Sequence, residues 1–597
     1  MKQFQKTSLI LHKRETKLQR WLELWQLKLR NFQNARLIAG LLFFVSLVPA
    51  SLKAEAGVEF LWTLPFLIVF LVFVAVTKNY HRHVQNLQGL LAFTRRQKNR
   101  VHGIPSGRSW KQAEEASRAL PMVRDLGLVG SHSLWTLLDE TLSEGGQKKL
   151  LEWMSVKPLD KNLLSARQET LKKLRPQSWF YTRLCLQANS NELNLSTLQL
   201  QDFLKKSFVD TKFFRIFVVS LCLWVLTASL MTFSISTGTK LPSVLFLAFP
   251  LFSLWSLGSV GTAFLSGVGL SHHLGTLVPL FTAIEKRSAY DHGLKEICGH
   301  IAAHRPSRAA KKLDFILGFV GTQTNPILRL FVNVLSPWTL TSVFFLEKAR
   351  RKMAEEFPAS LEELAELEVW GSLLIFDKYQ TQMYPEFANT GSLQCSQVFH
   401  PLLERSRAVA NDFSFPTGKT LGLLTGSNMS GKSTFLRTLG INQVLANMGA
   451  PVFADKFLTV PARIETCIEV SDSLRDGYSY FYAEVRRLKD ILQTAATKTP
   501  VLFLIDEIFR GTNNRERQIG SKAVIRALAQ EKTALGFIST HDLELTSLEE
   551  DHPSLMNLHF REDIDTNGKM VFYYHLKHGP CPTTNALRIM EAEGIKI

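Results

Sequence analysis

Residues 421–434 read Leu-Gly-Leu-Leu-Thr-Gly-Ser-Asn-Met-Ser-Gly-Lys-Ser-Thr, an apolar run that continues directly into a glycine-rich turn. The pattern G-x-x-x-x-G-K-[ST] is filled by Gly426, Gly431, Lys432 and Ser433. Between a strand and a helix, the backbone N–H groups of such a turn surround a phosphate chain. Lys432 would reach the β- and γ-phosphates, and the Ser433 hydroxyl would bind Mg²⁺. The residues expected to contact the nucleotide are Gly426, Ser427, Asn428, Met429, Ser430, Gly431, Lys432, Ser433 and Thr434.

A second apolar run, residues 501–507, reads Val-Leu-Phe-Leu-Ile-Asp-Glu and ends in two carboxylates. Five consecutive apolar residues are typical of a strand that is buried on both faces of a parallel sheet. Ligands of open α/β sheets bind at the carboxyl ends of the strands. We therefore expect Asp506 to contribute to the Mg²⁺ shell and Glu507 to orient or deprotonate the attacking water. The alternative is an acidic cap, which is the more common role of an isolated Asp-Glu pair.

A third expected strand, residues 534–540, ends in Thr540-His541-Asp542. His541 is placed to sense the γ-phosphate from the edge of the site, although a lone histidine is more often incidental. Together the three segments predict an enzyme that hydrolyses ATP with Mg²⁺ as its metal.

Composition limits the class of protein. The 597 residues predict several domains, and 46% hydrophobic residues leave room for large cores and for membrane spans. The net charge of +18 suits a polyanionic partner, either nucleic acid or the anionic inner leaflet of a membrane. Six scattered cysteines without a C-x-x-C pair offer neither a zinc site nor a disulfide framework, which favours a reducing compartment.

Four apolar stretches, residues 37–52, 60–77, 216–239 and 241–266, predict two transmembrane hairpins. Residues 1–36 hold nine Lys/Arg against two acidic residues, and residues 78–111 hold eight Lys/Arg. The positive-inside rule then places both termini and the nucleotide-binding domain in the cytoplasm of a multi-pass inner-membrane protein. A fully buried helical core is the alternative for each pair. We read residues 325–346 as amphipathic soluble helices, because Arg329, Asn333 and Pro337 interrupt them.

The basic arm also carries Trp and Leu residues, which suits either a helix on an anionic membrane surface or a helix in a bundle. The predicted fold class is multi-domain, with an α-helical core and lever region, two inserted transmembrane hairpins and a C-terminal α/β P-loop ATPase domain. The predicted parts are a basic amphipathic arm (1–36), transmembrane hairpin 1 (37–80), a core helical domain (115–207), transmembrane hairpin 2 (213–268), further core and lever helices (272–385) and the ATPase domain (390–597). Residues 557–562 and 570–576, on either side of Asn567-Gly568, are expected to form a hairpin.

The second half of the chain resembles the MutS family of DNA mismatch-repair ATPases, whose ATPase domain is of the ABC type. The similar segments are 425–434, D-E-I-F-R-G-T at 506–512 with Phe509 in place of a glycine, S-T-H-x-x-E-L at 539–545, and H-P-L-L at 400–403 followed by N-D at 411–412. Residues 477–481, G-Y-S-Y-F, are similar to the G-x-S-T-F segment of the family, whose serine reaches the partner's γ-phosphate across a dimer. The resemblance thus implies a homodimer in which Ser479 acts in trans. A weaker resemblance to the family's core helical domain covers roughly 115–207 and 272–385.

Two features depart from the family pattern. First, no Phe-x-Glu wedge, which would stack on a mispaired base, lies before the core, where the chain has the basic arm and apolar stretches. Second, those apolar stretches predict membrane anchoring, which is foreign to the soluble repair proteins. The resemblance implies a DNA-binding, ATP-gated dimeric clamp of the mismatch-repair type, here anchored in a membrane. The alternative is a membrane-bound ATPase of the same fold that remodels a protein or lipid partner without binding DNA. A transporter is less consistent, since the Leu-Ser-Gly-Gly-Gln segment of ATP-driven exporters does not occur.

Overall fold

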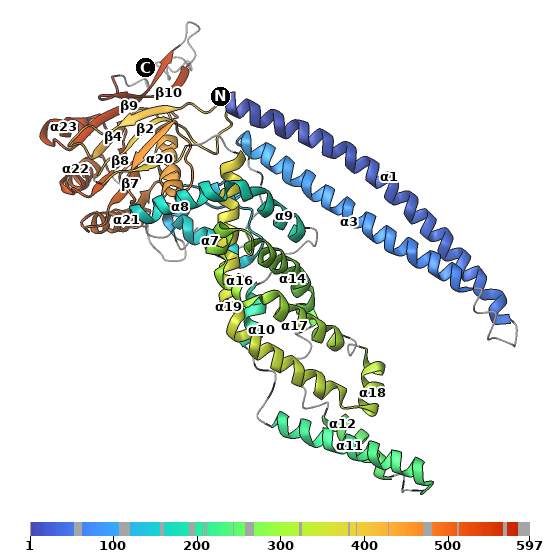
Figure 1. Ribbon diagram of the computed structural model, residues 1–597. Coiled ribbons are helices and arrows are strands. Elements are labelled where there is room, and N and C mark those ends of the chain that lie inside the picture. The colour runs from blue at the N-terminus through green and yellow to red at the C-terminus, as the bar shows by residue number, and fades with distance from the viewer. Residues whose placement is uncertain are drawn as a thin grey trace. The chain divides into compact units, whose positions relative to one another are not determined.

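The computed structural model divides the chain into two units (Figure 1). The first unit holds residues 1–139, 150–176 and 372–597, and the second holds residues 140–149 and 177–371. The structure describes residues 2–52, 63–104, 106, 120–155, 160–189, 197–205, 207, 209, 212–240, 242, 244–256, 268–321, 325–379, 383–389, 391–427, 429–469, 480–509, 513–564 and 570–582.

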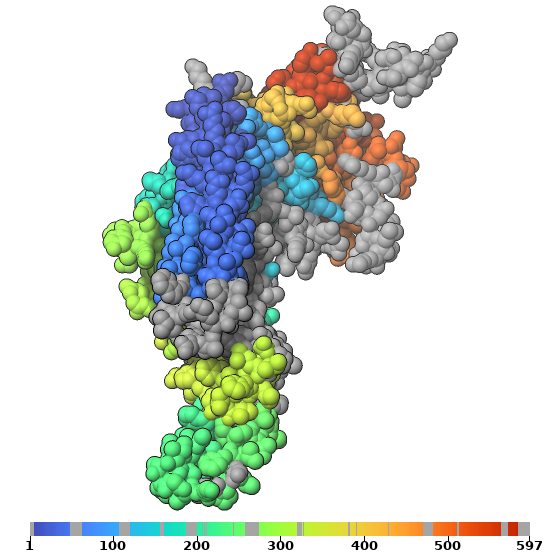
Figure 2. Space-filling model, turned by 90° about the vertical axis from the view of Figure 1, so that its right-hand side faces the viewer, coloured from blue at the N-terminus to red at the C-terminus, as the bar shows by residue number. Residues whose placement is uncertain are grey.

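The first unit begins with a pair of long helices, α1 (Lys2–Leu52) and α3 (Leu64–Val101), which lie side by side (Figures 1 and 2). Aromatic rings join them: the ring centroids of Trp25 and Tyr80 are 5.3 Å apart, and those of Phe32 and Tyr80 are 4.6 Å apart. Glu15 lies 2.9 Å from both Arg95 and Lys98, so the two helices run antiparallel. The basic arm and the first apolar stretch therefore form one continuous helix. Of the two interpretations of the arm, the structure supports the bundle helix.

Two sheets form the C-terminal part of the first unit. One has the strand order β1 (Glu386–Phe387), β5 (Lys456–Thr459), β2 (Gln394–Val398), β3 (Asn411–Ser414). The other has the order β10 (Met570–His578), β9 (Leu555–Ile564), β4 (Leu421–Thr425), β8 (Ala534–Ser539), β7 (Val501–Asp506), β6 (Arg463–Cys467). The described helices of this part are α20 (Lys432–Asn447), α21 (Tyr480–Ala495), α22 (Asn514–Gln530), the 3₁₀ helix η5 (Leu543–Ser547) and α23 (Leu548–Asp551). The expected hairpin is confirmed, since β9 and β10 pair antiparallel.

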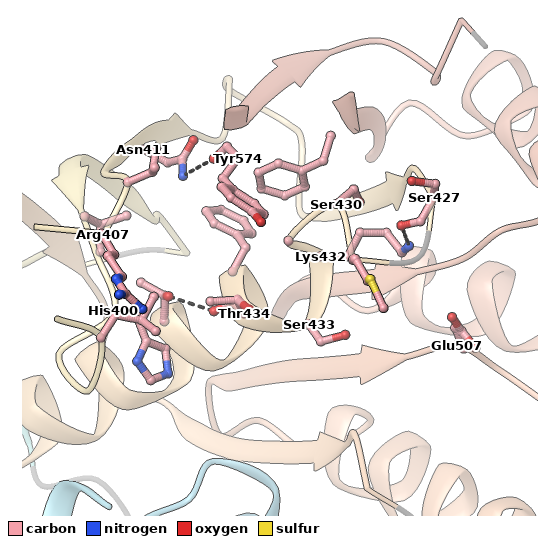
Figure 3. A pocket seen from close by; sticks show the side chains of 18 residues that line it. His400, Arg407, Asn411, Ser427, Ser430, Lys432, Ser433, Thr434, Glu507 and Tyr574 are labelled. Carbon is pink, nitrogen blue, oxygen red and sulfur yellow. Dashed lines mark hydrogen bonds between the residues drawn. The ribbon is translucent and has the colours of Figure 1, made fainter. Parts of the chain in front are cut away.

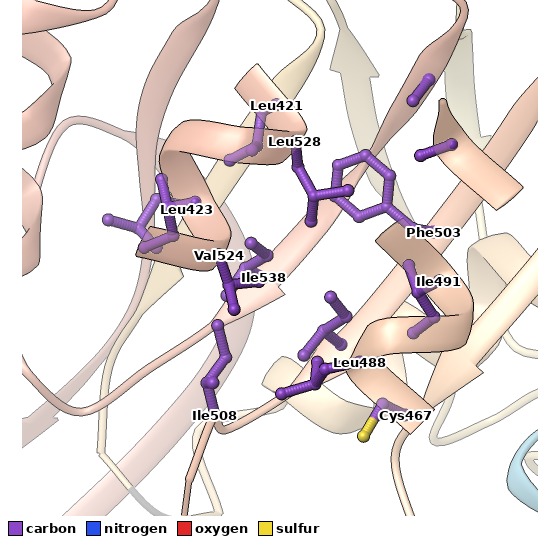
Figure 4. Close-up of a cluster of buried hydrophobic side chains, with 14 of the residues drawn as sticks. Leu421, Leu423, Cys467, Leu488, Ile491, Phe503, Ile508, Val524, Leu528 and Ile538 are labelled. Carbon is purple, nitrogen blue, oxygen red and sulfur yellow. The ribbon is translucent and has the colours of Figure 1, made fainter. Parts of the chain in front are cut away.

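The central strands of the six-stranded sheet are buried on both faces, as their apolar runs predict. Every residue of β4, β7 and β8 is buried. On one face, Leu421, Leu423 and Phe503 pack against Leu488 and Ile491 of α21 and Val524 and Leu528 of α22 (Figure 4). On the other face, Phe537 of β8 meets the rings of Phe413 and Phe435, with centroids 4.9 and 5.7 Å apart. This double burial fixes the strand ends that carry the predicted site.

The first unit also contains α5 (Pro121–Asp125), α6 (Leu134–Leu138) and α8 (Lys161–Leu174). Three elements cross the boundary between the units, namely α7 (Glu144–Ser155), η2 (Arg175–Gln177) and α19 (Trp338–Tyr379). Helices make up the described part of the second unit, and those within it are α9 (Ser178–Asn189), α10 (Thr197–Lys205), α11 (Phe213–Thr237), α12 (Val244–Ser256), α14 (Val268–Ser288), α15 (His292–Ile297), α16 (Gly299–His304), α17 (Pro306–Gly321) and α18 (Pro326–Leu335). The expected order, a helical region with apolar helices and then a C-terminal α/β region, is confirmed.

Two described helices, α3 and α11, are long and apolar enough to cross a membrane. They contain most of the predicted stretches 60–77 and 216–239. The stretch 37–52 is the end of α1, which does not pass the same test, and the stretch 241–266 yields the 13-residue helix α12 and then leaves the described residues. Helix α18 and the start of α19, bent by 93°, would add a third span if they are counted as one.

The segment 325–346, which we interpret as amphipathic soluble helices, forms α18 and the start of α19. α18 packs against the apolar helices: the Ser253 hydroxyl of α12 donates to Asn333 O at 2.8 Å, and Trp224 Nε1 of α11 donates to Leu335 O at 2.9 Å. The interruption at Asn333 makes a hydrogen bond across the bend, because Asn333 Oδ1 accepts from Thr339 N at 3.0 Å. The apolar side chains of α18 are left exposed, with Ile327 at 79%.

Candidate functional site

The candidate site lies where three parallel strands of the six-stranded sheet end. β4 pairs in parallel with β8, and β8 pairs in parallel with β7. The end of β4 continues through the glycine-rich turn into α20, while β7 ends at Asp506 and β8 at Ser539. The sequence-predicted segments are therefore brought to one edge of the sheet, where ligands of open α/β sheets bind.

Two glycines give the turn its shape. Gly426 has a φ of +141°, and a Cβ atom there would lie 2.6 Å from the carbonyl oxygen of Phe560. Gly431 has a φ of +112° and lies directly before α20. Both values are in the region that L side chains avoid. The turn thus leads into the start of a 16-residue helix that lines the cavity, and a helix N-terminus is suited to an anion.

The Lys432 side chain folds back into this turn. It is buried, and its Nζ donates to the carbonyl oxygens of Gly426 and Ser427, both at 2.8 Å; Figure 3 shows Lys432 beside Ser427. Burial lowers the pKa of Lys432, while nearby Glu507 and Asp506 act in the opposite direction. The ammonium group is held by two neutral acceptors, which anionic oxygens are able to replace.

Ser433, Asp506 and Ser539 form a chain of oxygen atoms at the strand ends. Ser433 Oγ donates to Asp506 Oδ2 at 2.7 Å, and Ser539 Oγ donates to Asp506 Oδ1. Hydroxyl and carboxylate oxygens are the ligands that Mg²⁺ prefers, and Mg²⁺ takes few of them from protein. Ser433 and Asp506 fit the predicted metal in donor type and proximity. The described residues contain no group of three or more His, Cys, Asp or Glu that would hold a metal by themselves.

Glu507 and His541 lie side by side at the edge of the cavity. His541 Nε2 is 2.5 Å from Glu507 Oε1, and Glu507 lines the cavity near Ser433 (Figure 3). Glu507 has a φ of +57°, and its backbone N–H donates to Ser539 O at 3.1 Å. A strained residue held by a neighbouring strand has a fixed direction for its side chain. The carboxylate is therefore set at the cavity with a histidine partner.

Phe509, which replaces a glycine of the family pattern, also has a positive φ of +60°. Its N–H donates to the buried Glu484 Oε1 at 2.6 Å, and its ring packs against Gly520. The replacement thus retains a backbone conformation that favours glycine, at a cost of about 1–2 kcal/mol.

The cavity in front of the turn has a volume of about 500 Å³. One side is the turn and the start of α20, and the opposite side is residues 398–411, between β2 and β3, which we call the wall segment (Figure 3). Burial, aided by Arg437, lowers the pKa of His400 in the wall segment to about 4. Tyr574 of β10 closes the cavity, and its carbonyl oxygen accepts from Asn411 Nδ2 at 3.0 Å.

Sequence reasoning found the polar end of this cavity and missed its opposite side. The 400–403 and 411–412 segments were recognised by their resemblance, but no role was assigned to His400, Leu403, Arg407 or Asn411. Nothing in the sequence distinguishes Tyr574 as a site residue, because tyrosine is common in strands. Two predicted residues, Asn428 and Ser479, lie outside the described residues. The remaining predicted residues from Gly426 to Thr434, together with Asp506, Glu507 and His541, are assembled at one place.

Comparison with known proteins bears on this C-terminal part. Residues 422–596 match the family MutS domain V. The chain is 32% identical over 239 residues to the DNA mismatch repair protein MutS of Leuconostoc citreum, covering 39% of this chain and 27% of that protein. It is 30% identical over 250 residues to the MutS of Listeria monocytogenes, and 29% identical over 284 residues to the MutS of Staphylococcus haemolyticus, covering 29% and 30% of those proteins. The resemblance to the MutS family is confirmed for this region, and the match spans less than a third of each relative.

Proposed function

We propose that the C-terminal region is a Mg²⁺-dependent ATPase of the MutS type, with the P-loop fold of the ABC class. The observation that carries this proposal is the contact of 2.7 Å between Ser433 and Asp506, beside a lysine held inside the glycine-rich turn. The similarity of residues 422–596 to MutS domain V supports it.

Each side chain has a defined task in this proposal. The N–H groups of the turn and of the start of α20 hold the phosphates. Lys432 exchanges the carbonyl oxygens of Gly426 and Ser427 for β- and γ-phosphate oxygens. Ser433 and Asp506 would hold Mg²⁺, which neutralises charge on the phosphates when bound. Glu507 orients the attacking water and accepts its proton.

His541 restricts the orientation of Glu507 and lies where it is able to sense the γ-phosphate. The end of the cavity lined by Val398, Leu403 and Tyr574 offers apolar and aromatic surface to the base of the nucleotide.

Two copies of the chain are proposed to close around ATP, with Ser479 of each reaching the γ-phosphate bound by the other. Closure of the two sites moves the helical region, and hydrolysis resets it. The proposed ligand of that region is DNA, bound mostly through its phosphates, because the chain has a net charge of +18 and lacks the expected wedge residues.

The proposed location is the inner membrane, with both termini and the ATPase domain in the cytoplasm. Exposed apolar side chains on α3 and α11 support this placement, and α18 of the second unit also exposes apolar side chains. The membrane-bound position also supports the second candidate, an ATPase that remodels a protein or lipid partner without binding DNA.

ATP hydrolysis by the full-length protein in vesicles tests the two candidates. The clamp predicts that added duplex DNA stimulates turnover and that the stimulation falls steeply between 50 and 200 mM salt, as expected for ~6 or more phosphate contacts. Lys432→Ala is the control that removes nucleotide-dependent turnover. Turnover indifferent to DNA but dependent on the composition of the vesicle would support the second candidate. Absence of turnover in every condition would contradict both.

A further inference from the structure

The C-terminal end of α3 lies against the wall segment of the cavity. α3 ends at Val101, and Gly103 follows with a φ of +73°. The amide of Gly103 donates to Arg100 O and the amide of Ile104 donates to Asn99 O, both at 3.0 Å. This pattern is the glycine cap that ends a helix with a left-handed residue.

Gly103 does more than end the helix, because it also fits against the wall segment. A Cβ atom at position 103 would lie 2.4 Å from the carbonyl oxygen of Leu403 and 3.3 Å from the Cα of Glu404. The Leu403 oxygen is a backbone atom and has no rotamer by which to move away. Any side chain at position 103 therefore displaces the backbone at 403–404, and Leu403 lines the cavity.

The wall segment is fixed from its other side. The Arg405 guanidinium lies over the Phe399 ring within the segment, 4.4 Å from its centroid, and over the Phe453 ring outside it, at 5.8 Å. Asn442 Nδ2 of α20 donates to Phe399 O at 3.5 Å, and Asn442 Oδ1 accepts from Phe453 N at 2.7 Å. Since α20 is the helix that begins at Lys432, the wall segment is held between the phosphate end of the site and the end of α3.

The contact also involves α1. Ser8 Oγ lies 3.0 Å from Nε2 of His102, the residue before Gly103. Further along the pair, Glu15 of α1 bridges Arg95 and Lys98 of α3. The residue that meets the wall segment thus belongs to a braced pair of helices.

We propose that Gly103 is a positioning residue for nucleotide binding, through which the α1–α3 pair and the occupancy of the cavity are coupled. The inference rests on the proposed function, because the cavity has to bind a nucleotide. The C-terminal end of α3 determines the position of Leu403. Because coupling is reciprocal, a nucleotide that displaces the wall segment changes the free energy of the contact between α3 and this segment by the same amount. Through Gly103, the α1–α3 pair directly contacts a segment that lines the cavity.

The test compares two glycine variants of the full-length protein in lipid nanodiscs. Gly127 is the matched control: its φ is +61°, and a Cβ atom there would meet nothing within 4 Å. Gly103→Ala and Gly127→Ala both place a methyl group on a left-handed residue of the first unit, at about 1–2 kcal/mol each. Only Gly103→Ala also collides with Leu403.

Binding of a fluorescent ATP analogue and steady-state hydrolysis are measured for both variants. Gly103→Ala is expected to raise Kd and KM about fivefold or more, the range of typical coupling. Its kcat stays close to wild type, because the contact is at the wall and not at Lys432 or Glu507. Gly127→Ala is expected to bind as the wild type does. Equal Kd values for the two variants would overturn the inference.

Hydrogen exchange of the wild type provides the second measurement, which does not depend on either variant folding. Addition of the ATP analogue is expected to change exchange at the amides of residues 102–104 together with those of the wall segment. A change confined to the wall segment would overturn the coupling. A wild type that binds no nucleotide would instead overturn the proposed function, and the inference with it.

Discussion

The glycine-rich turn and the junction of α3 with the wall segment border the same cavity, but only the turn is visible in the sequence. The turn is built by consecutive residues, and its glycines, lysine and serine have chemical roles at fixed spacing. The junction joins Gly103 to Leu403 across 300 positions of chain, and its chemistry is a close fit between backbone atoms. Local chemistry can be read from a pattern, whereas steric fit between distant segments requires coordinates.

The largest expected effect is at the turn. Lys432→Ala removes the ammonium group that lies 2.8 Å from the two loop carbonyl oxygens and is proposed to bind phosphate. We expect no measurable turnover, because the loss of one charge-stabilising donor, about 10²–10³-fold in rate, adds to the loss of nucleotide binding. Hydrolysis assays and binding of a fluorescent ATP analogue measure both quantities. Wild-type affinity and turnover in Lys432→Ala would remove the central assignment.

The next effect separates ATP binding from ATP hydrolysis, at the same edge of the six-stranded sheet. Glu507→Ala is expected to slow hydrolysis by about 10²–10⁴-fold, the usual contribution of a general base, while ATP stays bound. His541→Ala serves as the comparison, since it removes the partner 2.5 Å from Glu507 and leaves the carboxylate in place. Single-turnover kinetics with bound ATP distinguish the two. Equal rates for Glu507→Ala and the wild type would contradict its assignment.

The extent of sequence-based prediction follows the same division. The runs at 421–425 and 534–540 predict strands, the run at 501–505 predicts a strand buried on both faces of a parallel sheet, and the structure has all three side by side. Their ends carry Ser433, Asp506 and Glu507, so the polar half of the site was accessible from spacing alone. The wall segment has no regular period, and the role of Tyr574 depends on the pairing of β10 with β9. The contacts of Asn333 could not be read either, because a polar residue that bonds across a bend looks like one exposed to solvent.

On the side of the wall segment, His400 makes folding stability depend on pH. Because His400 has a folded-state pKa of about 4, the unfolded state binds more protons between about pH 6.5 and 4. Folding stability therefore decreases as the pH falls through this window, by about 1–3 kcal/mol. His400→Gln should flatten this part of the stability curve, measured by chemical unfolding of the full-length protein at pH 7, 6 and 5. An unchanged slope would show that another group controls it.

The smallest expected effect is in the helix pair itself. The side-chain hydrogen bond from Lys98, with help from Arg95, lowers the pKa of Glu15. The contribution of this carboxylate is present above the unfolded-state pKa of about 4.3 and is lost as the pH falls through the lower folded-state pKa. Glu15→Gln should cost only about 0.5 kcal/mol at pH 7, because solvent and salt screen the pair. Unfolding in 0.05 and 0.5 M salt measures this, with Glu23→Gln on the same helix as control. If Glu15→Gln nevertheless weakens nucleotide binding as much as Gly103→Ala, then the bracing of α1 on α3, and not the fit of Gly103, sets the wall segment.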